Sequence, residues 1–303
     1  MKHLIDIFDL KKQDVEWIIN QSIKEKEALK KNGNRNIKKI LKNKTIAMIF
    51  EKPSTRTRVS FQVAINQLGG SSIMMNFSDI HLARGETVAD TAKTLSRYVD
   101  AVVIRSFSHS LVREFSSFAD VPVINALTNS SHPCQVLADV MTIDEHFGCY
   151  KDKKVVWIGD FNNVSKSWVE ISSVLNIDLT ICTPNKYSPD KSLKQYIDKS
   201  ESISLENDKE IALKNKDVVI TDTWFSMGDK IGDREKFFRP YQVDQSAMSL
   251  ASENAIFMHC LPAYRGKEVT SNVIDGSQSV VFDEAENRLH IQRTLLGWCL
   301  NND

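Results

Sequence analysis

Short apolar runs alternate with helical patterns along nearly the whole chain. The helical patterns have apolar residues three or four positions apart, as one face of a helix requires. The sequence predicts helices at about 12–30, 58–68, 87–99, 110–118, 132–147, 165–175, 192–200 and 284–300. The apolar runs predict strands at 45–50, 71–76, 100–106, 121–126, 154–160, 178–184, 217–222, 255–260 and 279–282. Continuous apolar runs without polar alternation are typical of parallel strands that helices cover on both faces.

This alternation predicts an α/β fold with two doubly wound domains, each a parallel sheet flanked by helices. A chain of 303 residues is long enough for about two domains. The strand–helix rhythm restarts after Gly148, so we expect one domain at 1–147 and the other at 148–303.

Charge and cysteine content exclude several classes of protein. Lys plus Arg equals Asp plus Glu, at 39 each, so no broad basic surface for nucleic acid or an anionic membrane is expected. The five cysteines are odd in number and form no CxxC pair, which is typical of a reducing compartment. The chain start has no apolar signal-peptide core, and no apolar run reaches the roughly 20 residues of a membrane span. We therefore expect a cytoplasmic protein that binds neither nucleic acid nor membrane.

Charged and polar side chains gather just after several of the predicted strands. In open parallel sheets, ligands bind beyond the carboxyl ends of the strands, which is where these residues lie. The segment 51–58 follows a strand and opens a helix, where free N–H groups and the helix dipole favour an anion. Its hydroxyls and guanidiniums, which are donors suited to phosphate oxygens, belong to Ser54, Thr55, Arg56, Thr57 and Arg58. A capped helix with surface arginines is the alternative, but this density of donors favours an anion site. No GxxxxGK loop occurs, so it is not a nucleotide P-loop.

Two more strand ends in the first half carry candidate ligands. Arg105 lies near the end of the strand predicted at 100–106, where it is either a surface group or a site ligand. His132 and Gln135 follow a polar turn and can donate hydrogen bonds to a carbonyl oxygen. A helix cap with a satisfied histidine is the alternative interpretation.

The second half offers weaker signals. The turn at 159–163 lacks GxGxxG, so a nicotinamide site is poorly supported, and its asparagines suit a turn. Asp222, at a strand end, could bind an ammonium group or simply belong to a turn beside a buried Trp224. The His–Cys pairs at 132–134 and 259–260 suggest zinc, but local chelate spacing is absent, and we predict no metal and no cofactor.

Three motifs at strand ends, taken together, resemble the aspartate/ornithine transcarbamylase family. They are STRTR at 54–58, HPCQ at 132–135 and HCLP at 259–262, and DTWFSMG at 222–228 is similar to the ornithine-using branch. The resemblance implies an N-terminal carbamoyl-phosphate domain and a C-terminal amino-acid domain. It also implies that the last helix, at about 284–300, packs back on the first domain, and that the assembly is a homotrimer or a multiple of trimers.

The resemblance also implies roles for individual residues. Those expected to bind carbamoyl phosphate are Ser54, Thr55, Arg56, Thr57, His81, Arg105, His132, Gln135, Cys260, Leu261 and Arg288. Those expected to bind L-ornithine are Asn163, Asp222, Ser226 and Met227. The expected catalytic residues are Arg56, Thr57, Arg105, His132 and Cys260. His81 stands where family members often have glutamine, and Ala83 where they have glycine. A histidine can still donate a hydrogen bond.

The implied reaction is carbamoyl transfer from carbamoyl phosphate to the δ-amine of ornithine, which gives citrulline and phosphate in arginine metabolism. The nearest alternative is a transcarbamylase for another amine. The Asp222 carboxylate favours a substrate with a free ammonium, whereas an aspartate-specific site would want cationic groups there. A catalytically silent relative that only binds carbamoyl phosphate is a second alternative, and a dehydrogenase is a third that rests on fold alone.

Overall fold

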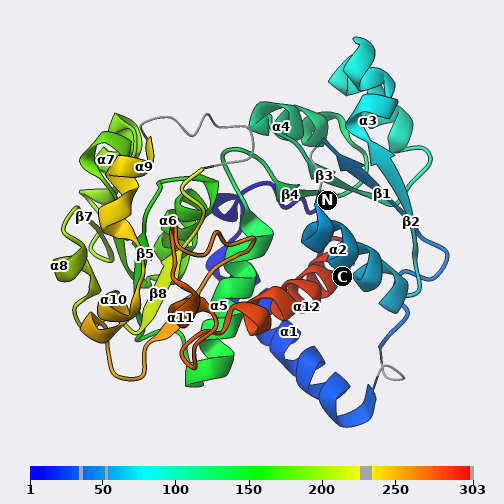
Figure 1. The fold of residues 1–303 in the computed structure, drawn as a ribbon. Helices are drawn as coiled ribbons and strands as arrows, with labels where there is room; N and C mark the ends of the chain where they lie inside the picture. The colour runs from blue at the N-terminus through cyan, green and yellow to red at the C-terminus, as the bar shows by residue number, and fades with distance from the viewer. Residues whose placement is uncertain (34–36, 52–53, 226–233, 301–303) are drawn as a thin grey trace. The chain divides into compact units, whose positions relative to one another are not determined.

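A computed structural model describes the chain except residues 34–36, 52–53, 226–233 and 301–303. The chain forms two compact units (Figure 1). Unit 1 contains residues 1–141 and 286–303, and unit 2 contains residues 142–285. Helices α5 (Pro133–Phe147) and α12 (Val281–Leu300) run through the two boundaries between the units.

The sheet of unit 1 has the strand order β2-β1-β3-β4, and all its pairings are parallel (Figure 1). The strands are β1 (Thr45–Phe50), β2 (Ser71–Asn76), β3 (Ala101–Arg105) and β4 (Val123–Leu127). The helices are α1 (Lys12–Asn32), α2 (Thr55–Gln67), α3 (Val88–Leu95) and α4 (His109–Phe118), with short 3-10 turns η1 (Ile7–Asp9), η3 (Phe77–Asp79) and η4 (His81–Arg84). The central strands β1 and β3 are almost entirely buried, as their apolar runs predict.

The sheet of unit 2 has the order β7-β6-β5-β8-β9, again with parallel pairing throughout. The strands are β5 (Lys154–Ile158), β6 (Asp178–Cys182), β7 (Ile203–Glu206), β8 (Val218–Thr221) and β9 (Ile256–Met258). The helices are α6 (Asn163–Leu175), α7 (Lys191–Ile197), α8 (Lys209–Leu213), α9 (Glu235–Phe238), α10 (Gln245–Leu250) and α11 (Ser271–Ile274), with 3-10 turns η5 (Asn185–Tyr187) and η7 (Arg239–Tyr241).

The predicted fold class, two parallel sheets flanked by helices, is confirmed. The strand predicted at 279–282 is wrong, because Val281 begins α12 and Ser279 makes only an isolated bridge to Phe257. An apolar run of this length cannot be distinguished from a buried helix start by periodicity. Strand β7 was not predicted, because this four-residue edge strand is only partly buried.

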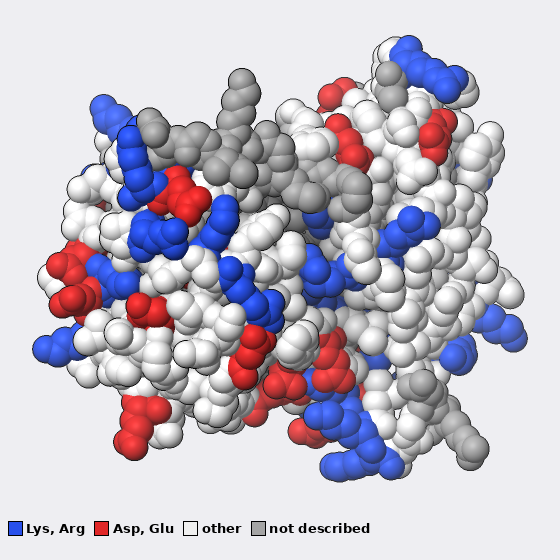
Figure 2. Space-filling view, viewed as in Figure 1, with Lys and Arg blue, Asp and Glu red and all other residues white. Residues whose placement is uncertain are grey.

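Surface charge is mixed in sign. Lysines and arginines are interspersed with acidic residues over much of the face in Figure 2. In the part of the chain that the structure describes, no helix is both long and apolar enough to cross a membrane.

Helix α12 contacts α1 within unit 1 through buried polar groups. The Lys26 ammonium donates to the Asn287 side chain at 2.6 Å, and the hydroxyls of Ser22 and Thr294 lie 2.9 Å apart. Both side chains of α1 are buried, so these bonds replace lost contacts with water. They fix α12, which also carries the predicted site residue Arg288.

His290 on α12 makes stability sensitive to acid. Burial, with the charges of Arg293 and Lys26, lowers the pKa of His290 to about 4. The unfolded chain, with a histidine pKa of about 6.5, therefore binds more protons between these values. Stability is complete above pH 6.5 and declines as the pH falls towards 4. Between pH 7.5 and 5, we expect the free energy of unfolding of the wild-type protein to fall by about 2 kcal/mol more than that of His290→Gln. Urea unfolding of both proteins at the two pH values measures this difference. Parallel losses in the two proteins would contradict this assignment.

Candidate active site

The end of β1 is tied to the end of β3. The Glu51 amide donates to the Arg105 carbonyl oxygen at 2.8 Å. The Glu51 carboxylate accepts from the Ser106 hydroxyl at 2.6 Å and the Phe107 amide at 2.7 Å. Helix α2 follows, with Ser54 as its N-cap residue. The Ser54 side chain makes no capping hydrogen bond, so within the described residues its hydroxyl is not consumed by the helix.

Two guanidiniums meet at the Thr57 hydroxyl. Arg105 donates from Nη1 at 3.2 Å, and Arg288 of α12 donates from Nη2 at 2.5 Å. Thr57 is only 1% exposed. A register shift between Ile104 and Arg105 alters the pairing of β3 with β4 just before the arginine, and such irregularities re-aim side chains. Guanidiniums stay charged at any working pH, so two positive charges converge on a neutral oxygen, an arrangement that suits an anion.

His132 lies in the same electrostatic environment, directly before α5. Burial and the charges of Arg288 and Arg105 lower its pKa well below the ordinary value of 6.5. The imidazole is therefore neutral near pH 7 and offers one N–H donor without adding a charge. This suits a donor to a carbonyl oxygen, as the sequence suggests.

The first turn of α5 holds two further polar side chains. Gln135 is fully buried, and its amide nitrogen donates to the Asp139 carboxylate at 2.8 Å, which fixes the plane of the amide. The Cys134 thiol donates to the Asn125 carbonyl oxygen at 3.5 Å, and burial raises its pKa to about 12. A thiol that remains protonated is a poor metal ligand or nucleophile.

The other predicted carbamoyl-phosphate residues are more exposed. Arg56 is half-buried, and its Nε atom is buried without a hydrogen-bond partner among the described residues. Thr55 is exposed at the start of α2, and His81 is exposed on η4. No hydrogen bond within the described ranges joins His81 to Thr57.

Asp222 organises the corresponding edge of unit 2. One carboxylate oxygen accepts from the Asn162 amide nitrogen at 2.7 Å. The other accepts from the Thr223 backbone amide at 2.8 Å and from the Cys260 thiol at 3.3 Å. The carboxylate is 9% exposed. A buried carboxylate with only neutral partners among these contacts is suited to a cationic ligand.

Asn162 is a site residue that sequence reasoning missed. Its side-chain oxygen caps α6 by accepting from Val164 at 2.9 Å and Ser165 at 3.2 Å. This cap orients the amide nitrogen towards Asp222. The predicted ligand Asn163 is the first residue of α6 and half-buried. The sequence signal that could have identified Asn162 is an asparagine between a strand and a helix, a position where asparagine often caps the helix.

His259 holds the turn that carries Cys260 and Leu261. Its Nδ1 accepts from the Leu261 amide at 2.9 Å, so the ring proton is on Nε2, 3.3 Å from the Glu268 carboxylate. Leu261 has φ +57°, a left-handed conformation that is costly for a leucine and that this bond supports. The Leu261–Pro262 peptide is cis.

The ligand atoms of Asp222, His259 and Cys260 lie within 4.8 Å of one another, as a metal site would require. Both ring nitrogens of His259 are already engaged, so a metal would have to displace one of these contacts. The predicted ornithine residues Ser226 and Met227 lie outside the described residues.

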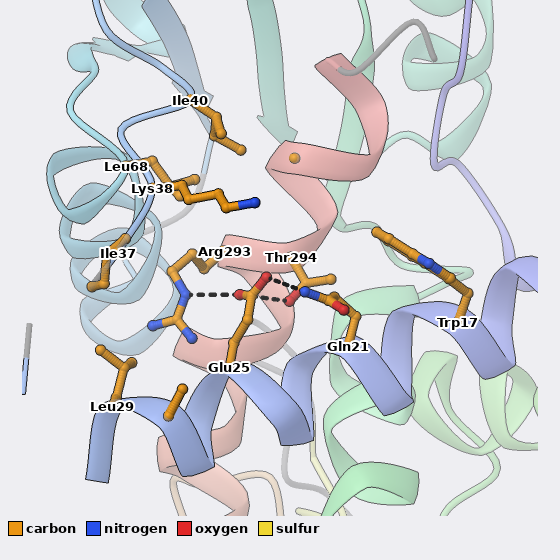
Figure 3. A pocket seen from close by; sticks show the side chains of 12 residues that line it. Trp17, Gln21, Glu25, Leu29, Ile37, Lys38, Ile40, Leu68, Arg293 and Thr294 are labelled. Atoms are coloured by element: carbon orange, nitrogen blue, oxygen red, sulfur yellow. Dashed lines mark hydrogen bonds and ion pairs between the residues drawn. The ribbon is translucent and has the colours of Figure 1, made fainter. Parts of the chain in front are cut away.

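A cavity of about 270 Å³ lies elsewhere in unit 1 (Figure 3). It is lined by residues of α1 and α12 together with Ile37, Lys38, Ile40 and Leu68, and none of the predicted site residues contributes to it. Its Glu25 carboxylate accepts from Gln21 at 2.9 Å, Arg293 at 3.2 Å and Thr294 at 3.4 Å. The Glu25 carboxylate is thus satisfied by its neighbours within the cavity wall.

Comparison with known proteins places this geometry in a family. The family described as "Aspartate/ornithine carbamoyltransferase, carbamoyl-P binding domain" matches residues 2–145, and its "Asp/Orn binding domain" matches residues 151–299. The ornithine carbamoyltransferase of Nitrobacter winogradskyi is 51% identical over 99% of this chain and 97% of its own length.

Solved structures agree with the sequence comparison. Ornithine carbamoyltransferase from Pyrococcus furiosus has a TM-score of 0.93 and 44% identity, covering 100% of this chain and 98% of that one. The anabolic ornithine carbamoyltransferase from Campylobacter jejuni has a TM-score of 0.90 and 40% identity, and covers 100% of both chains. The arginine cluster at Thr57 and the Asp222 carboxylate thus lie on a scaffold shared over the full length, and the chain belongs to the aspartate/ornithine carbamoyltransferase family.

Proposed function

We propose that the protein transfers the carbamoyl group of carbamoyl phosphate to the δ-amine of L-ornithine, which yields L-citrulline and phosphate. The observation that carries this proposal is the convergence of Arg105 and Arg288 on the buried Thr57 hydroxyl beside a helix N-terminus. Relatives about 50% identical over the full chain are named ornithine carbamoyltransferases, which supports the same activity. The reaction belongs to arginine metabolism.

Residues 1–147 form the proposed carbamoyl-phosphate domain. Ser54, Thr55, Arg56 and Thr57 hold the phosphate at the start of α2, where N–H groups and the helix dipole also favour it. The Gln135 side chain holds the carbamoyl amide, since its own nitrogen is engaged by Asp139.

The carbonyl oxygen of carbamoyl phosphate becomes an oxyanion when the amine attacks. Arg105, His132 and Thr57 provide donors for it, with Arg288 adding positive charge beside them. Because His132 is neutral, it stabilises the oxyanion by donating a hydrogen bond from one N–H. The phosphate leaves and can accept the amine proton, so the reaction needs no dedicated base.

Residues 148–303 form the proposed ornithine domain, apart from α12, whose Arg288 serves the phosphate side. Asp222, held by Asn162, binds the α-ammonium group, and Asn163 binds the carboxylate. Ser226 and Met227 complete the proposed ornithine contacts. The Leu261 backbone and Cys260 contact the carbamoyl group. Cys260 donates to Asp222 and acts by orientation, because the δ-amine itself is the nucleophile.

The substrate amine must lose a proton before it attacks. A lysine-like amine has a pKa of about 10 in water, and burial lowers that value because it disfavours the charged form. A closed site would therefore raise the fraction of neutral amine.

The proposed assembly is a homotrimer or a multiple of trimers that works in the cytoplasm. His81, which is exposed on η4, would then serve the phosphate site of a neighbouring subunit. Size-exclusion chromatography with light scattering tests the assembly, and a monomer with full activity would contradict it.

A citrulline assay tests the reaction directly. Purified protein is incubated with carbamoyl phosphate and, in parallel, ornithine, acetylornithine, putrescine or aspartate. The products scored are phosphate and the carbamoylated amine, which is citrulline only in the ornithine reaction. We expect both products with ornithine alone, because only ornithine presents both the δ-amine and the free α-ammonium for Asp222. Turnover of another amine would keep the carbamoyl-phosphate half of the proposal and overturn the ornithine site. Binding of carbamoyl phosphate without any turnover would instead indicate a catalytically silent relative.

A further inference from the structure

The N-terminal segment of unit 1 contacts β4 through an isolated parallel bridge between Leu4 and Ile124. Asn125, which is fully buried, donates its backbone amide to the Leu4 carbonyl oxygen at 2.7 Å. The Asn125 side chain donates to the Ile5 carbonyl oxygen at 2.8 Å. These bonds bring Asp6 to the end of β4, where the turn 128–131 begins.

Asp6 is buried, with its side chain 9% exposed, and its carboxylate has three partners. It accepts from His109 Nε2 at 3.0 Å and from the Ser131 side chain, and it pairs with the Arg113 guanidinium. Burial raises the pKa of Asp6, but the bonds from His109 and Ser131 and the nearby charges outweigh burial and hold the pKa at about 2. Asp6 is therefore a permanently charged anchor at neutral pH.

His109 links this anchor to the turn. Its Nδ1 lies 3.0 Å from the Thr128 hydroxyl oxygen. A carboxylate can only accept, so the nitrogen facing Asp6 carries a proton, although the Arg113 Nε also lies 3.2 Å from it. With the proton on Nε2, Nδ1 accepts from the Thr128 hydroxyl, whose second acceptor is the more distant Ser131 carbonyl oxygen at 3.5 Å.

The Thr128 hydroxyl closes the turn that leads into His132. Its oxygen accepts from the backbone amides of Ser130 at 3.3 Å and Ser131 at 3.1 Å. The Thr128 amide donates to the Ser131 carbonyl oxygen at 2.8 Å. Ser130 and Ser131 are thus held by hydrogen bonds to Thr128, and the Ser131 side chain is also bonded to Asp6. The remaining turn residue, Asn129, donates its backbone amide to the Phe107 carbonyl oxygen at 3.2 Å.

We propose that Asp6, His109 and Thr128 form a positioning relay that holds the His132 imidazole in place for the carbamoyl carbonyl oxygen. The relay rests on the proposed function, because His132 matters only if that carbonyl is bound. The three residues act through the turn backbone that leads to His132. Misplacing a donor by about 1 Å can lower the rate by about 100-fold, so a turn that holds the imidazole rigidly favours turnover.

The test is a double-mutant cycle on Thr128 and His132. Thr128→Val keeps the side-chain shape and removes the hydroxyl. We expect it to lower kcat/KM for carbamoyl phosphate by about 10-fold or more, with the KM for ornithine unchanged. In a His132→Ala background the same substitution should cost less than about twofold, because the group it positions is gone.

Matched variants separate positioning from general destabilisation. Thr180→Val in unit 2 removes another buried threonine hydroxyl, bonded to Ser204 at 3.0 Å, and should leave turnover unchanged. His109→Gln keeps a donor and an acceptor and should retain most activity, whereas His109→Leu should resemble Thr128→Val. Equal losses from Thr128→Val with and without His132 would overturn the relay.

Carbamoyl-phosphate binding, measured by calorimetry on the same four proteins of the cycle, makes the two proposals separable. If the wild-type protein binds carbamoyl phosphate but produces no citrulline, the proposed function fails. The relay is then judged by affinity alone. A weakening of about threefold or more that depends on His132 supports it, and a weakening that is the same in both backgrounds overturns it.

Discussion

Replacing Arg105 by alanine is expected to reduce kcat/KM for carbamoyl phosphate by at least about 10² to 10³-fold, the usual cost of losing one oxyanion donor. The guanidinium is one of two that meet at Thr57, and it contributes to the field that keeps His132 neutral. Its loss removes a donor and a positive charge from the proposed anion site. The measurement is initial-rate kinetics at several carbamoyl-phosphate concentrations.

The fold should survive this change. Arg105 is at the end of β3, and removing one of two like charges from a buried cluster relieves repulsion. We expect the melting temperature to change by only a few degrees, which corresponds to about 1 kcal/mol. Arg97→Ala, at an exposed position of the same unit, is the matched control and should keep full activity. An Arg105→Ala protein with wild-type kinetics would contradict the assignment.

The positions of the candidate residues at strand ends could be predicted, because strand periodicity and the parallel-sheet rule need only local sequence. Arg105 ends β3, and Thr57 lies at the start of the helix after the neighbouring strand β1, so their closeness follows from topology. The pairing of Thr57 with Arg288 could not be derived this way, because the two residues are 231 positions apart. Only the resemblance to a family suggested it.

Features that depend on backbone geometry could not be predicted from the local sequence. His259 follows a strand and has the chemistry of a ligand, yet it supports the left-handed Leu261. The local sequence cannot distinguish these roles, because the decision depends on where Glu268 lies. Nothing in the local sequence indicated a role for Asp6. Its proposed role depends on the contact of its segment with β4 and on His109, which is 103 residues away in sequence.

Replacing Asp222 by asparagine is expected to raise the KM for ornithine by about 10 to 100-fold, the range for one hydrogen bond to a charged group. Asparagine keeps the size of the side chain and an oxygen that can accept from Thr223, but it removes the negative charge. Its amide group would also face the Asn162 nitrogen as a second donor. The affinity for carbamoyl phosphate should remain within about twofold, because the proposed anion site lies on other residues.

Asp178→Asn is the matched control for this substitution. Asp178 begins β6 in the same unit, is largely exposed, and pairs with Lys216 rather than with the site. The variant removes the carboxylate charge of a pair that does not contact Asp222, so it should keep the wild-type KM for ornithine. If Asp222→Asn also kept that KM, the carboxylate would not bind the α-ammonium group. The specificity for ornithine over acetylornithine would then have to come from other residues, because the free ammonium is the group that distinguishes the two substrates.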